Sequence, residues 1–154
     1  MMKVLLMNAK QFAMVLGVIF VVVGILGFVP GITQMHHADD PNLAVEGPGH
    51  GRLLGLFHVN ILHNLVHIGF GVLGIVMARA GQARNYCRFV AIAYGLLAIL
   101  GLIPALKLQY TFGLIPIEGH DVWLHALIAI AAAYFGWSGA SEPAPAPATG
   151  PSTV

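Results

Sequence analysis

The chain has 154 residues, of which 58% are hydrophobic and only 8% charged, and its mean hydropathy is +0.83. Soluble domains carry about a quarter charged residues, so this composition excludes a soluble globular protein and indicates an integral membrane protein. The net charge of +1 gives no reason to expect nucleic acid as a partner. The sequence has no Gly-rich phosphate loop, no G-x-S-x-G and no H-E-x-x-H motif, so we expect a protein that is not an enzyme.

The apolar residues gather in four segments, each about the 20 residues that a helix needs to cross a bilayer. Backbone polar groups inside the membrane must be satisfied within a helix or a closed barrel, and the lack of alternating polarity favours helices. We therefore expect an all-α fold, an integral membrane four-helix bundle over residues 1–138. The predicted helices lie at residues 11–29, 60–78, 86–104 and 121–137.

The orientation in the membrane follows from the basic residues, which favour the short cytoplasmic loops. Five of them lie on one side of the predicted helices and two on the other, which places both termini in the cytoplasm. The cytoplasmic set is Lys3, Lys10, Arg79, Arg84 and Arg88, and the outer set is Arg52 and Lys107.

The two remaining regions are an outer loop and a tail. The outer loop, residues 31–59, is punctuated by Gly and Pro and is expected to be irregular. Its His36 and His37, next to acidic residues, form a weak secondary candidate site for Cu or Zn; an ordinary solvated loop is the alternative. The tail, residues 139–154, is rich in Pro and Ala, and we expect a disordered cytoplasmic segment.

An internal repeat relates the two halves of the chain. GLFHVNILHNLVH at 55–67 aligns with GLIPIEGHDVWLH at 113–125, and the first and third helices end in ILGFVP and ILGLIP. The sequence thus predicts two tandem transmembrane hairpins, a parallel repeat about an axis along the membrane normal. Small residues let membrane helices approach closely, so Gly71 and Gly74, which align with Ala129 and Ala132, predict packing of the second helix on the fourth.

A polar stripe crosses the outer part of the second helix. Its residues are spaced i, i+3, i+4 and i+7, which places them on one helical face. Asn60 and Asp121 are candidate N-cap residues of their helices. Together with the aligned positions of the second copy, the predicted polar cluster comprises Asn60, His63, Asn64, His67, Glu118, Asp121 and His125.

Four members of this cluster carry chemistry that suits a metal ion. Three imidazoles, from His63, His67 and His125, would meet the carboxylate of Asp121, a donor set typical of Zn, Cu or Fe. Haem held by two histidines ranks lower, because helices closed by Gly and Ala leave little room for a macrocycle. The alternative is that the same groups pair with one another across the helices and hold the hairpins together with no ligand.

The motifs LHNLVH at 62–67 and DVWLH at 121–125, with GLIP and an Arg-bearing inner loop between them, resemble those of a known family. It is a family of small bacterial four-helix membrane proteins catalogued only as a domain of unknown function. The resemblance covers residues 11–137. It implies a multi-pass protein of the bacterial cytoplasmic membrane, and it implies no reaction.

Three functional hypotheses follow. The first is a non-catalytic accessory subunit that sits in the lipid bilayer and binds a partner, as part of a larger membrane complex or as a homo-oligomer. The second is a metal-binding membrane protein that uses His63, His67, His125 and Asp121. The third is a small transporter or proton relay, which is disfavoured because the polar stripe ends after about a third of the membrane.

Overall fold

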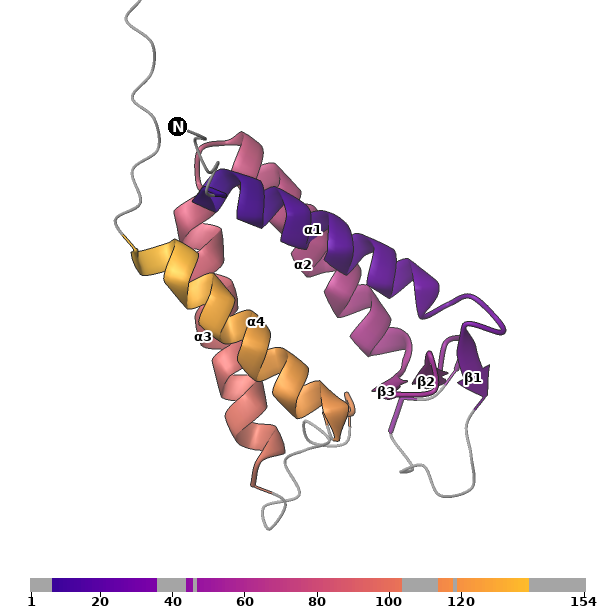
Figure 1. Cartoon of the computed structure of the whole chain (residues 1–154). Coiled ribbons are helices and arrows are strands. Elements are labelled where there is room, and N and C mark those ends of the chain that lie inside the picture. Colours follow the sequence, from indigo (N-terminus) through magenta and orange to yellow (C-terminus); the bar gives the residue numbers. More distant parts are fainter. Residues whose placement is uncertain (1–6, 36–43, 46, 104–113, 118, 139–154) are drawn as a thin grey trace, which may run out of the picture.

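A computed structural model describes residues 7–35, 44–45, 47–103, 114–117 and 119–138. This part of the chain is mostly helical, as expected, but it also contains a small antiparallel sheet, so the all-α prediction was incomplete (Figure 1). In chain order the elements are α1 (Ala9–Leu26), β1 (Thr33–Met35), β2 (Gly51–Leu53), β3 (Phe57–Val59), α2 (Ile61–Arg79), α3 (Ala83–Gly101) and α4 (His120–Trp137). The tail at 139–154 lies outside the described residues.

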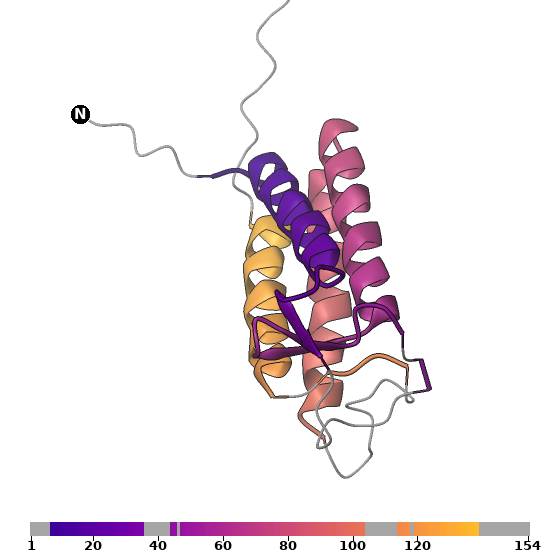
Figure 2. The same ribbon diagram turned by 90° about the vertical axis from the view of Figure 1, so that its right-hand side faces the viewer.

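The helices form two antiparallel pairs. α1 packs closely along α2, and α3 packs closely along α4, whereas contact between the pairs is much sparser. The pairs lie nearest to each other where α1 begins and α4 ends, and they diverge toward the end that carries the sheet (Figure 1). A view turned by 90° shows all four helices running roughly side by side above the sheet (Figure 2). The fold therefore has one closed end and one wider end.

Three of the described helices, α1, α2 and α3, are long and apolar enough to span a membrane, with mean hydropathies of 2.2, 1.8 and 1.2. Their outward faces carry exposed aliphatic side chains such as Val15, Ile19 and Val76, as a lipid-facing surface requires. α4 is not among the three, because its first two turns carry Asp121 and His125. A membrane protein is thus supported, and a fourth span remains a prediction.

Glycines let α1 and α2 touch backbone to backbone. A Cβ built on Gly71 would lie 2.6 Å from the carbonyl oxygen of Gly17, and one built on Gly17 would lie 2.8 Å from that of Gly71. Two turns nearer the sheet, a Cβ on Gly24 would lie 2.6 Å from the carbonyl oxygen of Asn64. Distances this short exclude any side chain, so these glycines fix how near the two helices come.

The predicted seam between α2 and α4 was wrong. Gly71 faces α1, and Gly74 lies against the ring of Tyr86 on α3. On α4, Ala129 faces Gly95 of α3, the two Cβ positions being 3.9 Å apart. Small residues do specify close packing, but α1 has glycines of its own, seven residues apart, and these pack against the glycine face of α2 in place of α4.

Aromatic rings make much of the contact between the pairs. Phe12 of α1 stacks on Phe135 of α4 with centroids 4.3 Å apart, and Phe20 of α1 stacks on Tyr94 of α3 at 5.2 Å. The hydroxyl of Tyr86 donates to the carbonyl of Phe70, 3.1 Å away. These contacts involve the buried core. Phe12 and Phe135 close the narrow end of the bundle, whereas Phe20 and Tyr94 stack beside His67 and His125.

The sheet replaces much of the loop that we expected to be irregular. Its strand order is β1-β2-β3, with Gly51 paired to Met35 on one side and to Val59 on the other. A tight turn of three residues joins β2 to β3, and two of them, Leu54 and Gly55, have positive φ, of 55° and 72°. The prediction failed because strands of three residues are too short to show alternating polarity.

Two substitutions on one helix test the glycine contact. Gly71→Ala should lower the free energy of unfolding by about 1–3 kcal/mol, because the new methyl group meets the backbone of α1. Gly69→Ala, two residues earlier, meets no atom within 4 Å and should leave stability unchanged or slightly raised. Unfolding in mixed micelles, followed by circular dichroism, measures both. Equal stability of the two variants would contradict the proposed contact.

Candidate functional site

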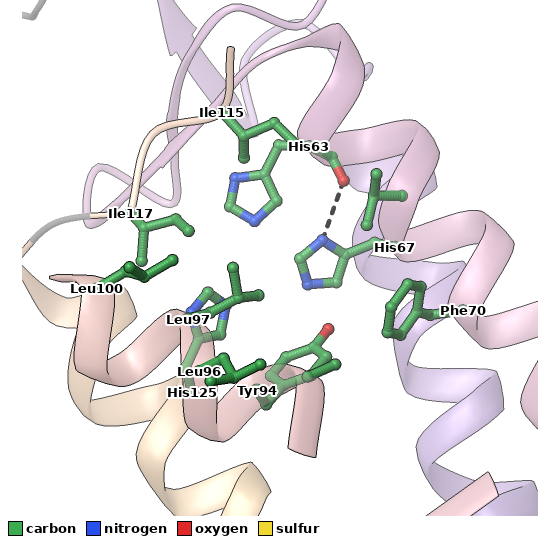
Figure 3. A pocket seen from close by; sticks show the side chains of 12 residues that line it. His63, His67, Phe70, Tyr94, Leu96, Leu97, Leu100, Ile115, Ile117 and His125 are labelled. Carbon is green, nitrogen blue, oxygen red and sulfur yellow. Dashed lines mark hydrogen bonds between the residues drawn. The ribbon is translucent and has the colours of Figure 1, made fainter. Parts of the chain in front are cut away.

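The polar stripe of α2 divides into two functional groups. The side chains of Asn60 and Asn64 reach the loops at the wide end of the bundle. The rings of His63 and His67 point into the interior between the helix pairs (Figure 3). One helical face therefore supplies both the supports of the site and two of its four candidate ligands.

Asn60 joins three separate segments. It is fully buried, and its Oδ1 accepts from the backbone N–H of His63 at 2.9 Å, which makes it the N-cap of α2 as predicted. Its Nδ2 donates to the carbonyls of Val45, at 3.1 Å, and Leu114, at 2.6 Å. The amide thus ties the outer loop and the segment before α4 to the start of α2.

Asn64 has a similar role toward α1. Its buried side chain lies directly against Gly27, where any Cβ would overlap the amide, and its Nδ2 donates to the carbonyl of Gly49 at 3.3 Å. Gly49 has a φ of 80°, which a residue with a side chain rarely adopts. Asn64 therefore holds the loop against the end of α1.

Backbone carbonyls fix the tautomers of the two α2 histidines. Nδ1 of His63 lies 3.1 Å from the carbonyl oxygen of His58, and Nδ1 of His67 lies 3.1 Å from that of His63 (Figure 3). Because a carbonyl only accepts, each Nδ1 must carry the proton. In the neutral rings, each Nε2 then presents a lone pair.

α4 contributes a carboxylate and a third imidazole, one turn apart. Asp121 and His125 are both buried, each 3% exposed. The N-cap of α4 is Gly119, so Asp121 lies in the first turn and its predicted capping role was wrong. His125 packs edge-on against Tyr94 with centroids 4.9 Å apart, and its Nδ1 is buried without a hydrogen-bond partner among the described residues.

Three of the four predicted metal ligands converge. His63, Asp121 and His125 each offer a donor atom, and these atoms lie within 4.8 Å of one another. His67 lies beside this group, with its ring centroid 4.7 Å from that of His63, but it is not part of it. The helices α2 and α4 make little other contact in the described structure, so the cluster joins them only near their first turns.

Cavities border the cluster on two sides. One of about 360 Å³ reaches toward α3, and a second of about 110 Å³ lies toward the sheet; His63, His67 and His125 line both. The larger cavity is completed by Phe70, Tyr94 and aliphatic residues that sequence analysis did not single out. Tyr94, a polar-tipped aromatic in the middle of an apolar helix, was the one available signal.

The other histidines of the chain do not contribute a ring to the cluster in the described structure. His58 serves the cluster through its backbone carbonyl, and His120 is exposed, with its ring edge-on to Phe57 at 6.4 Å. The remaining predicted site residues, Glu118, His36 and His37, lie outside the described residues.

Comparison with known proteins places the chain in one family. The model of the family described as "Domain of unknown function (DUF4383)" matches residues 10–138, which confirms the resemblance to an uncharacterised domain family. Neither a curated protein nor a solved structure matches the chain.

The junction at Asn60 gives a testable prediction. Asn60→Asp keeps the oxygen that caps α2 but replaces the donating NH₂ by an oxygen that faces two carbonyls. We expect the free energy of unfolding to fall by about 1–3 kcal/mol. Asn8→Asp is the matched control, because the Asn8 side chain caps α1 only by accepting, from the N–H of Gln11. Equal unfolding curves for the two variants in mixed micelles would contradict the junction.

Proposed function

Because the chain belongs to the DUF4383 family, whose description assigns no function, we propose a function from the geometry of the site. The protein is a membrane protein that binds one Zn or Cu ion through His63, Asp121 and His125. The observation that carries this proposal is the convergence of three buried donor atoms, from two helices, within 4.8 Å of one another.

The donor set has the right chemistry for these metals. Imidazole nitrogens with one carboxylate oxygen form a typical zinc site, and imidazole also suits copper. His63 already has the arrangement of a ligating histidine, in which one ring nitrogen donates to a backbone carbonyl and the other is left to bind metal. Three protein ligands leave a fourth tetrahedral position for water or an exogenous group.

Binding would require a modest contraction. Ligand atoms about 2.0–2.1 Å from one tetrahedral zinc lie about 3.3 Å from each other. The donor atoms must therefore approach by at most about 1.5 Å, a movement that side-chain rotation and a small shift of α4 relative to α2 supply. The ion would then join the two helix pairs at the end where they diverge.

Structural pairing without a ligand is the main competing explanation. It predicts that the buried imidazoles satisfy one another, yet Nδ1 of His125 is buried with no hydrogen-bond partner in the described structure. Leaving a buried polar atom unsatisfied costs about 1–3 kcal/mol, and a bound ion would remove the need for ring nitrogens to pair. The unsatisfied nitrogen of His125 therefore favours metal binding over structural pairing of the side chains. Haem remains a weaker prediction for the cofactor than a single metal ion.

The other two functional hypotheses receive less support. A transporter or proton relay needs polar groups along the whole path, whereas the described core toward the narrow end is apolar and aromatic. An accessory role in a larger complex or a homo-oligomer remains a prediction, for which co-purification is the direct test.

We also propose that the two helix pairs arose by duplication. Gly27 faces Asn64 across the first pair, and Gly101 faces Val122 across the second, at aligned positions of the predicted repeat. Phe20 and Tyr94, which align with each other when the ILGFVP and ILGLIP motifs are superposed, stack across the pairs. These matching contacts support a pseudo-twofold arrangement.

The membrane topology completes the proposal. α4 lies along α3, and its outward residues Leu127 and Ile130 are among the most exposed hydrophobic side chains, which supports a fourth span. We propose that both termini lie in the cytoplasm, as the distribution of basic residues supports, with the cluster toward the outer side of the membrane. A bacterial inner membrane is what the family resemblance implies.

Metal analysis of variants tests the proposed function. The purified wild type, loaded with Zn and desalted, should retain one ion per chain by inductively coupled plasma mass spectrometry. His125→Ala and Asp121→Asn should each weaken zinc affinity at least about tenfold in a chelator competition, because each removes a ligand. Cu(II) loading, measured in the same way, decides between the two metals.

Two controls define the site. His120→Ala removes an exposed histidine from the same helix turn as Asp121 and should bind zinc as the wild type does. The double variant His36→Ala, His37→Ala should also retain the ion, which separates the cluster from the loop. A wild type that retains neither metal, or affinities that are the same in His125→Ala and His120→Ala, would refute the proposal.

A further inference from the structure

The larger cavity next to the histidine cluster has the size and lining of a second binding site. It encloses about 360 Å³ between α2, α3 and the segment 114–117, which is within the usual range of small-molecule pockets. Its walls are largely aliphatic, with Leu97, Leu100 and Ile117 among them, and three imidazoles from α2 and α4 line it as well (Figure 3). An apolar pocket with a few convergent polar groups is the usual form of a ligand site.

The cavity opens toward the lipid. Val66 of α2 and Leu96 of α3 line it and are also 38% and 56% exposed, so it reaches the surface between these two helices. Both helices are apolar enough to span a membrane. A ligand dissolved in the bilayer therefore meets the opening directly.

The charge of the lining residues restricts the ligand to a neutral one. No Lys, Arg, Asp or Glu is among the described residues that line the cavity. An anionic head group, such as a fatty-acid carboxylate, would be desolvated there without a counter-ion, at high cost. The two aromatic residues, Phe70 and Tyr94, have centroids 5.9 Å apart and are inclined at 64°, which offers faces and edges to a flat ring.

The imidazole of His67 requires a ligand that donates a hydrogen bond. Nδ1 of His67 carries its proton to the carbonyl of His63, so Nε2 of the neutral ring can only accept. A ligand hydroxyl satisfies this atom, whereas a carbonyl or ether oxygen meets another lone pair.

We propose that this cavity binds a neutral, lipid-soluble ligand with a hydroxyl on a flat ring, the chemistry of a phenol or a quinol, and that the hydroxyl donates to Nε2 of His67. The ring packs against Phe70 and Tyr94, and an apolar tail leaves between Val66 and Leu96. The metal ligands proposed above do not include His67, but His63 and His125 line both sites, so the cavity is tested in the metal-free protein.

Three matched probes test the proposal: 4-octylphenol, its methyl ether 4-octylanisole, and octylbenzene. Binding is measured by equilibrium dialysis between phosphatidylcholine nanodiscs with and without the chelator-treated full chain. 4-Octylphenol should bind saturably at one per chain, and the two probes that lack a hydroxyl should bind about tenfold more weakly, as the loss of one buried hydrogen bond requires.

Variants locate the site and separate it from the metal cluster. Leu97→Trp fills the cavity and should weaken 4-octylphenol binding at least about tenfold, whereas Ile99→Trp, on the exposed face of the same helix, should not change it. His67→Leu should bind all three probes equally. Zinc retention by Leu97→Trp should match the wild type, so failure of one proposal is distinguishable from failure of the other.

Three outcomes would overturn the inference. They are equal affinity of the wild type for 4-octylphenol and 4-octylanisole, unchanged phenol binding by Leu97→Trp, and uptake of the phenol that does not exceed its partition into empty nanodiscs. In the last case, phospholipid recovered from the purified protein by solvent extraction would identify an acyl chain as the occupant.

Discussion

The buried amide of Asn60 is the interaction on which the geometry of the site depends. α2 and α4 barely touch in the described structure, so direct helix packing does not set the distance between their polar side chains. Asn60 caps α2, and so positions His63, while the same amide holds Leu114, from the segment that leads into α4. A fully buried amide in an apolar setting must have its hydrogen bonds satisfied, which makes this junction costly to break. The candidate metal ligands come from two separate helix pairs, and their convergence thus depends on one side chain that is not itself a metal ligand.

The histidines show how a membrane interior accommodates polar chemistry. The Nδ1 protons of His63 and His67 go to the carbonyls of His58, just before α2, and of His63, within its first turn, so the directions of the two rings are set. The Nε2 atoms of these rings remain as acceptors on an otherwise apolar wall. Near a carboxylate, such a nitrogen suits a cation. Away from a carboxylate, it suits a ligand hydroxyl. Asp121 is near His63 and His125 but does not line the larger cavity. The two proposed sites therefore differ in chemistry although they share a wall.

Sequence predicted the helices and the stripe better than it predicted their partners. The second helix was expected at 60–78 and lies at Ile61–Arg79, because a long apolar run after an Asn is an unambiguous signal. The face that carries His63 and His67 followed from helical spacing alone. Spacing within one helix holds no information on which neighbour it meets, so Gly71 was assigned to α4 although it packs on α1. The sheet was missed because its strands are short, and Tyr94 because one aromatic residue in a core helix is ordinary.

The divergence of the helix pairs has a mechanical consequence. The stacked rings of Phe12 and Phe135 hold the pairs together at the narrow end, 10 to 14 residues along α4 from His125 and Asp121. At 1.5 Å per residue this is a lever arm of about 15–20 Å. Rotation of one pair about that aromatic contact by only about 5° moves the far end by about 1.5 Å. The Phe20–Tyr94 stack also joins the two pairs, beside His67 and His125, so such a rotation must slide one of these rings across the other as it changes the spacing of the donor atoms.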